Sequence, residues 1–588
     1  MSLTLAMRNA LSGMNLNQFG LAVTSNNISN VNTPGYTRKI VQQMSRTANG
    51  IGGGVDIAGV TRRVNDGLAR ELRSQMSRMG LSNVQSTYLA RVQDSFGTPG
   101  SANAINANIG RLAASFEALG ATPQNTQTQA DTVNDAVRMA RQINSMATST
   151  NNLRGQSDQE IGTTISRINE LATQIDDLND QIVQGINTTA GGSSVTDAQD
   201  RRDQAIRELA ELVDVATYTR SDGRTMVTIG GYNLVGDTVQ TVAYTPAAVV
   251  SPSTTFGAIT IGGVGDLTSR VTNGKLKSLI TLRDTTLPNY MAQLDTMALA
   301  LRDRVNAVHN DGTCVPAQRT LTGTQSGLAA GTVFPASTGA VRIAITDATG
   351  AIVRVVDYNL PAVASTVGAV TTAINAALGP DGTCTINASG QIVIQATNAA
   401  NGVAINENTG QVGATGQGLS QYFGLNDFFT GTDNPAVNGD LALSLAVNPT
   451  LVSNPGYISR GDLSLTAVVG ENGVAPGDGS VAQRLAAVFT TQYSFSAVGG
   501  MPAMTNTIGN FSAALISFNA SLASTANSDY DISQTTIDNL DKRIGSESGV
   551  SIDEEMSNMV VLENAYNASA QVIRTVNQMF DELTRILG

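Results

Sequence analysis

The chain has 588 residues, of which 41% are hydrophobic and 14% charged, and its 47 acidic and 35 basic side chains give a formal net charge of −12. This excludes nucleic acid as an expected partner, because neutralising phosphates needs a dense basic face, and no apolar run reaches the roughly 18 residues of a membrane span. One histidine and two cysteines leave little material for histidine-based catalysis, a metal site or a disulfide framework, so the composition predicts a structural or interaction protein.

An amphipathic helix is predicted at the N-terminal end, from about Leu3 to Ile28 or Ser29. Apolar side chains recur there every seven residues, at Met7, Met14, Leu21 and Ile28. We expect the helix to stop before residues 32–36, where Pro34 presets the second position of a turn and Gly35 tolerates positive φ at the third. The sequence therefore predicts a type II turn.

The interior alternates between helical and β patterns. Isoleucines at 161, 168, 175 and 182, with leucines at 171 and 178, predict coiled-coil packing within a helix over 131–185. Further helices are expected over 197–212, from Pro288 to 312, and over 479–544. Short strands are expected within 224–235 and 257–261, and the alternation of apolar residues at 341–345, 352–358 and 391–395 predicts an all-β insertion over 313–469.

A longer apolar stripe predicts a helix at the C-terminal end. Six residues follow one another at intervals of seven, with no Gly or Pro among them: Ile552, Met559, Tyr566, Ile573, Phe580 and Leu587. Ser551 followed by Glu554 resembles a capping box. The two terminal stripes could pack within one chain or among copies. Polar interruptions such as Thr24 and Ser569 favour assembly, so we expect ends that are poorly ordered in the isolated chain.

These patterns predict a multidomain α+β fold, in which terminal and central helices form an α-helical coiled-coil axis and all-β modules are inserted in the middle of the chain. Four domains are expected. They are the terminal helices (1–60 with 546–588), a helical body (61–212 with 268–312 and 475–545), a small β module (213–267) and an outer β module (313–474).

Both ends carry motifs that resemble the bacterial flagellar rod, hook and junction proteins. Residues 25–36 are similar to an N-terminal motif of that superfamily, which includes Asn30, Asn32, Thr33, Pro34, Gly35 and Tyr36. Residues 548–556 and 565–570 resemble the matching C-terminal motif. Three internal stretches favour the hook-associated protein 1 family, the hook–filament junction proteins, within this superfamily: 200–203, 294–309 and 423–429.

The resemblance implies a structural protein without enzymatic activity or cofactor, exported by the flagellar type III apparatus without a cleaved signal peptide. It implies an extracellular ring of identical copies between hook and filament. The implied partners are the hook protein, a filament-side junction protein and an export chaperone at the C-terminus. The terminal helices would form an inner tube, which makes the ten stripe residues named above the expected packing residues.

Alternatives remain open at this stage. The chain could be a hook or distal-rod protein of the same superfamily, or an extracellular β-rich adhesin or glycan-acting enzyme. His309 could act in catalysis, but without a second histidine a helix-end role is favoured. Cys314 and Cys384, which both follow Asp-Gly-Thr, could form a disulfide or mark two similar turns. Arg62 is expected to make an exposed surface ion pair.

Overall fold

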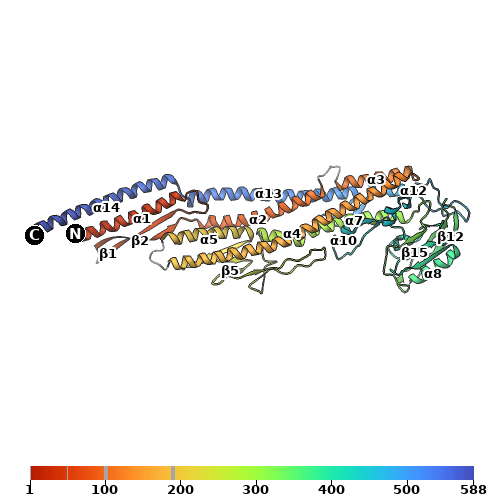
Figure 1. Ribbon diagram of the computed structural model, residues 1–588, viewed down its shortest axis with the longest axis horizontal. Coiled ribbons are helices and arrows are strands. Elements are labelled where there is room, and N and C mark those ends of the chain that lie inside the picture. Colours follow the sequence, from red (N-terminus) through yellow and green to blue (C-terminus); the bar gives the residue numbers. More distant parts are fainter. Residues whose placement is uncertain (1, 49–50, 98–103, 187–191, 588) are drawn as a thin grey trace.

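The molecule is a long rod with both chain ends at one tip and a globular module at the other (Figure 1). The computed structural model describes residues 2–48, 51–97, 104–186 and 192–587. Long helices run along the rod, and small antiparallel sheets lie on its side and at its far end. The predicted multidomain α+β class is confirmed, whereas the predicted domain boundaries stay a prediction.

The shaft is a bundle of long helices around one continuous apolar core. The 61-residue α4 (Thr126–Ile186) is a single helix, and the predicted rows of isoleucine and leucine on it are buried. The helix predicted after Pro288 begins earlier, because α6 continues through a π-helical turn into α7. The other shaft helices are α2 (Asp66–Phe96), α3 (Ile105–Ala121), α5 (Gly192–Leu212), α6 (Gly274–Thr281), α7 (Leu287–Asn310), α12 (Ser480–Val488) and α13 (Ile508–Ser548).

The single helix predicted over 479–544 is wrong. A short hairpin of β19 (Tyr493–Phe495) and β20 (Met504–Asn506) separates α12 from α13. Gly499 and Gly500 both adopt positive φ in the turn of this hairpin, a conformation that favours glycine and ends a helix.

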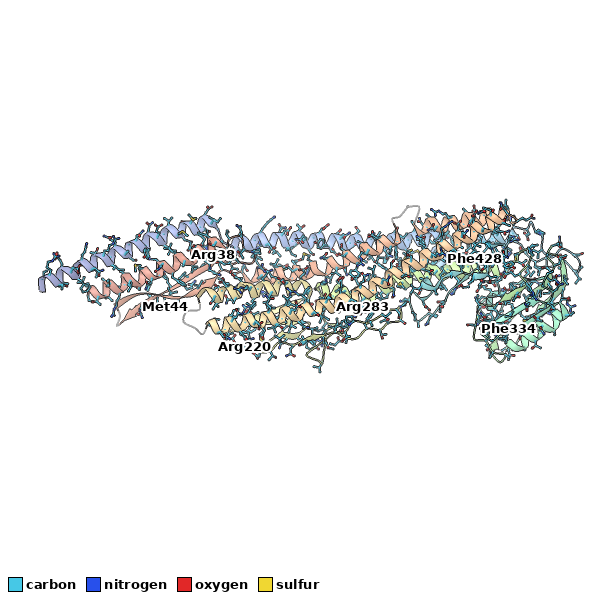
Figure 2. All side chains as sticks on the ribbon, in the orientation of Figure 1. Arg38, Met44, Arg220, Arg283, Phe334 and Phe428 are labelled. Atoms are coloured by element: carbon cyan, nitrogen blue, oxygen red, sulfur yellow. The ribbon has the colours of Figure 1, made fainter. Side chains whose placement is uncertain are left out.

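The small β module lies along α4 and consists of two three-stranded antiparallel sheets. Two buried arginines hold its irregular segment on the shaft: Arg154 donates to the carbonyls of Ser251, Pro252 and Thr254, and Arg283 donates to the Tyr244 hydroxyl at 2.5 Å (Figure 2). The strands are β3 (Val215–Thr219), β4 (Thr225–Ile229), β5 (Tyr232–Val235), β6 (Val242–Ala243), β7 (Thr260–Ile261) and β8 (Gly265–Asp266).

The outer module is built on two three-stranded antiparallel sheets, ordered β12-β11-β16 and β14-β15-β9. The three predicted strands are confirmed as β11 (Ala340–Thr346), β12 (Ile352–Asn359) and β15 (Ile392–Ala396). Cys314 and Cys384 are both buried and free, so no disulfide joins them. The remaining strands are β9 (Thr320–Thr322), β10 (Val333–Phe334), β13 (Ser365–Thr366), β14 (Gly382–Ile386), β16 (Gly402–Asn406), β17 (Phe429–Thr430) and β18 (Ala446–Val447).

Two segments differ from the predicted domains. The outer module is not all β, because α8 (Val367–Leu378) packs on its sheets; its buried residues Val367, Val370, Ile374 and Leu378 follow a helical period, and Thr366 caps the helix. Residues 1–60 are not all helical either. A long antiparallel hairpin of β1 (Lys39–Ala48) and β2 (Ile51–Arg62) follows the first helix. It is called the hairpin below.

The motif at 423–429 fastens the outer module to the end of α7. The side chain of Asn306 accepts hydrogen bonds from the backbone of Phe428 (3.0 Å) and Phe429 (2.8 Å). His309 is fully buried. Its Nδ1 lies 2.6 Å from the carbonyl of Asn426, and its Nε2 accepts a hydrogen bond from the Ser459 N–H at 3.0 Å. Burial lowers the pKa of His309 to about 4, so the neutral ring serves as a structural helix-end residue.

Glu407 caps a short helix beside this junction. Its carboxylate accepts the N–H of Leu419 at 2.7 Å and that of Ser420, at the start of α9 (Leu419–Phe423). Burial raises the pKa of Glu407 to about 7, and the nearby Asp311 adds to the shift. The folded chain therefore binds a proton on Glu407 more tightly than the unfolded chain does.

We expect this carboxyl group to make the outer module less stable at alkaline pH. Its contribution is fully present below the ordinary pKa of about 4.5 and is lost as the pH rises through 7, a change of about 3 kcal/mol. Glu407→Gln should remove this slope from the free energy of unfolding, measured by denaturation between pH 4.5 and 8. Glu471→Gln, in the same module, is the control. Equal slopes in wild type and Glu407→Gln would contradict the assignment.

Candidate assembly interface

Two terminal helices pair antiparallel at the tip of the rod (Figure 1). They are α1 (Leu3–Ser29) and α14 (Ile552–Leu587), and the predicted bounds of α1 are confirmed. Asn27 contacts Glu555, Gly20 lies against Leu562, and Gly13 lies against Ser569. Moving seven residues toward the N-terminus of α1 thus corresponds to moving seven residues toward the C-terminus of α14. In this register Leu3 lies opposite Met579, and the last eight residues of α14 extend about 12 Å past α1.

Glycines let the two helices approach closely. A Cβ atom on Gly20 would lie 3.1 Å from the Leu562 side chain, and one on Gly13 would lie 3.4 Å from Ser569 Oγ. The apolar stripe predicted from the sequence did not include these positions. Their seven-residue spacing is the signal that could have revealed them. The helices are formed and paired within one chain, and poor order of these ends in the isolated chain stays a prediction.

The predicted stripe residues divide into covered and uncovered groups. On α14, Ile552 and Phe580 are exposed, and the side chain of Leu587 lies outside the described part of the structure. The middle of the stripe therefore packs within the chain, while its packing in an assembly stays a prediction. The half-buried members are Met7, Met14, Leu21, Ile28, Met559, Tyr566 and Ile573.

A second apolar row on α14 is uncovered and was not predicted. Val572, Met579 and Ile586 follow one another at intervals of seven and are 45%, 51% and 78% exposed. Val561 lies on the same side of the helix and is also exposed. We call these four residues the open row. The heptad spacing of these residues is visible in the sequence, but the more regular stripe next to them was assigned as the packing face instead.

A short extended segment joins the terminal pair to the shaft. Thr37 Oγ1 donates to Asp200 at 2.7 Å and Lys39 forms an ion pair with Asp197, both on α5. Arg38 points the other way and pairs with α14, at 2.6 Å from Glu554 and 2.7 Å from Glu555 (Figure 2). Because successive side chains of an extended chain point to opposite sides, residues 37–39 bind both bodies at once.

Buried polar groups complete this contact between the terminal pair and the shaft, which is called the joint below. The side chain of Asn27 donates to the Lys39 carbonyl (3.0 Å) and to Glu555 (3.0 Å), and it accepts from the Lys39 N–H (3.1 Å) and the Tyr36 hydroxyl (2.9 Å). Burial, then the carboxylates of Asp197, Asp200 and Glu555, raise the pKa of Tyr36, so its phenol keeps the proton that it donates. Sequence analysis missed Asn27, although a polar residue on the inner face of an amphipathic helix was a usable signal.

Arg62 belongs to the joint, contrary to the expected exposed pair. The hairpin carries it to α5, where its guanidinium lies 2.8 Å from Asp200 and 2.9 Å from Asp203. Burial opposes the charged form, but the two carboxylates outweigh it and raise the pKa of Arg62. The acidic side chains of the stretch 200–203 therefore bind both the segment that follows α1 and the end of the hairpin.

The motif residues 30–36 form the turn that starts this segment. The Tyr36 N–H donates to the Thr33 carbonyl at 3.2 Å and Gly35 has φ +78°, which confirms the type II turn. Asn30 ends α1, with its side chain donating to the Asn26 carbonyl at 3.0 Å. Asn32, Thr33 and Pro34 are exposed, and the turn borders a hollow of about 390 Å³ against α5.

The described ranges contain no candidate metal centre. Within them, no group of three or more His, Cys, Asp or Glu side chains could hold a metal ion. Over the same ranges, no helix has the length and apolarity that crossing a bilayer requires. The polar clusters of the joint are instead paired and hydrogen-bonded between elements of the fold.

Comparison with known proteins agrees with this arrangement. Residues 89–354 match the family described as the flagellar hook-associated protein FlgK helical domain. Residues 7–37 match the flagella basal body rod protein family, and 546–586 match the C-terminal family of the basal body rod FlgEFG proteins. Flagellar hook-associated protein 1 of Escherichia coli K12 is 27% identical over 594 residues, spanning 99% of each chain. Over its whole length the chain is thus similar to flagellar hook-associated protein 1.

The chain is a structural protein of the flagellum at the hook–filament junction, and not an enzyme. Hook-associated protein 1 of Salmonella typhimurium is also 27% identical, over 52% of this chain and 56% of its own. Among solved structures, the hook junction protein FlgK from Burkholderia pseudomallei aligns with a TM-score of 0.47 and 16% identity, covering 82% of this chain and 100% of that chain. The sequence matches to flagellar proteins leave no support for an extracellular adhesin or a glycan-acting enzyme.

We expect the joint to depend on Glu555 far more than on Glu554. The Glu555 side chain is 2% exposed and that of Glu554 is 60% exposed, although both bind Arg38. Removing one partner of a buried pair costs about 3 kcal/mol, whereas an exposed pair contributes under about 1 kcal/mol. Glu555→Gln should therefore increase the exchange rate of the Arg38 amide hydrogen roughly 100-fold.

Glu554→Gln is the matched control, since it removes the other carboxylate that contacts Arg38. The Arg38 N–H donates to the Ser548 carbonyl at 2.9 Å, so its exchange reports opening of the joint. Similar small effects of the two substitutions would show that the joint does not depend on the buried charge.

Proposed function

We propose that copies of this chain form a ring between hook and filament by packing their terminal helices side by side. The observation that carries the proposal is the open row on α14. Four large apolar side chains remain uncovered on a helix whose other face is packed on α1. Covering one such side chain contributes roughly 1.5–3 kcal/mol, so several per subunit can hold a ring together. The predicted stripe residues left exposed, Ile552 and Phe580, would be covered in the same assembly.

The resemblance to flagellar hook-associated proteins also suggests which proteins contact the ring. We propose the hook protein as the partner on one side of the ring and a filament-side junction protein on the other. An export chaperone would bind near the C-terminus, where α14 offers uncovered apolar side chains before assembly. Export would proceed through the flagellar type III apparatus without removal of a signal peptide, which places the assembled ring outside the cell.

The open row can be tested by placing charge on it. We expect the double substitution Val572→Asp and Met579→Asp to abolish filament attachment in cells that lack their own copy of the gene. Burying two unpaired carboxylates between helices costs several kcal/mol per subunit. The purified variant should keep its helical content, because both side chains are uncovered in the single chain. Electron microscopy of the cells is the measurement.

Gln571→Asp with Gln578→Asp is the matched control. It adds the same charge one residue earlier in each case, at exposed positions off the open row. Cells with this variant should carry normal filaments. Removing residues 576–588 should leave the shaft and outer module folded but prevent junction formation. Normal filaments with the open-row variant or with the truncated chain would contradict the packing mechanism.

A further inference from the structure

An open groove lies between α1 and the hairpin near the tip of the rod. It encloses about 780 Å³, and its apolar lining includes Leu11 from α1 and Ile57 from β2. Leu11 is 47% and Ile57 is 41% exposed, so the two walls do not cover each other. Arg8 also lines the groove and gives it one basic flank, while Arg46 on the other wall pairs with Asp56 at 3.4 Å. The groove therefore suits an apolar segment that carries acidic side chains.

The last two turns of α14 have this character. In the register set by Asn27 with Glu555 and by Gly20 with Leu562, residues 580–587 lie past the start of α1. This stretch, called the overhang below, exposes the apolar side chains of Phe580, Leu583 and Ile586. It also exposes Asp581 and Glu582, of which Glu582 pairs with Arg585 of the same stretch at 3.4 Å.

The overhang cannot reach the groove of its own chain. It continues α14 as one unbroken helix, away from the part of α1 that forms the groove wall. The two features are thus a projection and a recess at different places on one molecule. A contact between such features is heterologous, and its repetition among identical copies closes into a ring or continues as a helix.

We propose that the overhang of each subunit seats in the groove between α1 and the hairpin of the next subunit. This inference rests on the proposed ring and names the contact that builds it. Ile586 and Leu583 lie against Leu11 and Ile57, and Asp581 faces Arg8. The occupant is a second copy of this chain.

Crosslinking between two differently tagged chains tests the contact. One chain carries Ile57→Cys and the other Ile586→Cys, and both are expressed in cells that lack their own copy of the gene. Hook–filament complexes are isolated and mildly oxidised. We expect a disulfide-linked dimer that contains one chain of each kind. The native Cys314 and Cys384 are buried, so they contribute little background.

Val561→Cys in place of Ile586→Cys is the control. Val561 is on the same helix and exposed, but it lies outside the overhang, so its yield of mixed dimer should be at least tenfold lower. Equal yields would overturn the proposal. A photo-crosslinking residue at 586 gives a second measurement: a product with the mass of two copies supports the groove contact, and a product only with the hook protein contradicts it.

Filament attachment in the same cells distinguishes a failure of the groove contact from a failure of the proposed ring. Normal filaments without the mixed dimer would contradict the groove contact and leave the proposed ring intact. Chains that are folded and exported but absent from hook–filament complexes would contradict the proposed function itself.

Discussion

The extended segment 37–39 is the constraint on which the rest of the structure depends. Its first and third side chains bind α5, and Arg38 between them binds α14, so one short stretch fixes the terminal pair relative to the shaft. Asn27 and Glu555 are buried at its centre. Moving either body would leave a buried charge unpaired, which costs more than breaking a surface ion pair.

A fixed joint gives the rod two ends with different tasks. At one tip, α1 and α14 cover only part of each other, and apolar side chains stay open along α14. At the other end, the motif at 423–429 is held through Asn306 and His309, so the outer module is an extension of α7. The tip where both chain ends meet thus carries a regular uncovered apolar row, while Phe334 and Phe428 are buried at the distal end (Figure 2).

Local pattern was enough to predict α1, α4, α14 and the turn after α1. The isoleucine row of α4 repeats over many turns, and Pro34 with Gly35 dictates a turn geometry by itself. Tertiary contacts decided the rest. α8 was missed because five of its 12 residues are β-branched and also suit a strand. The ion pair of Arg62 with Asp200 joins residues far apart in the chain. The uncovered faces of the terminal helices were only partly predicted, since heptad spacing marks helical faces but not which face the chain itself covers.

The most direct test of the central claim is electron microscopy of cells from which this gene has been deleted, with flagellin measured in the medium. A structural junction between hook and filament predicts hooks without filaments and flagellin released as monomer, restored by the wild-type chain. Cells without hooks would move the protein to the rod or hook, and normal flagella in the absence of a duplicate gene would contradict the account.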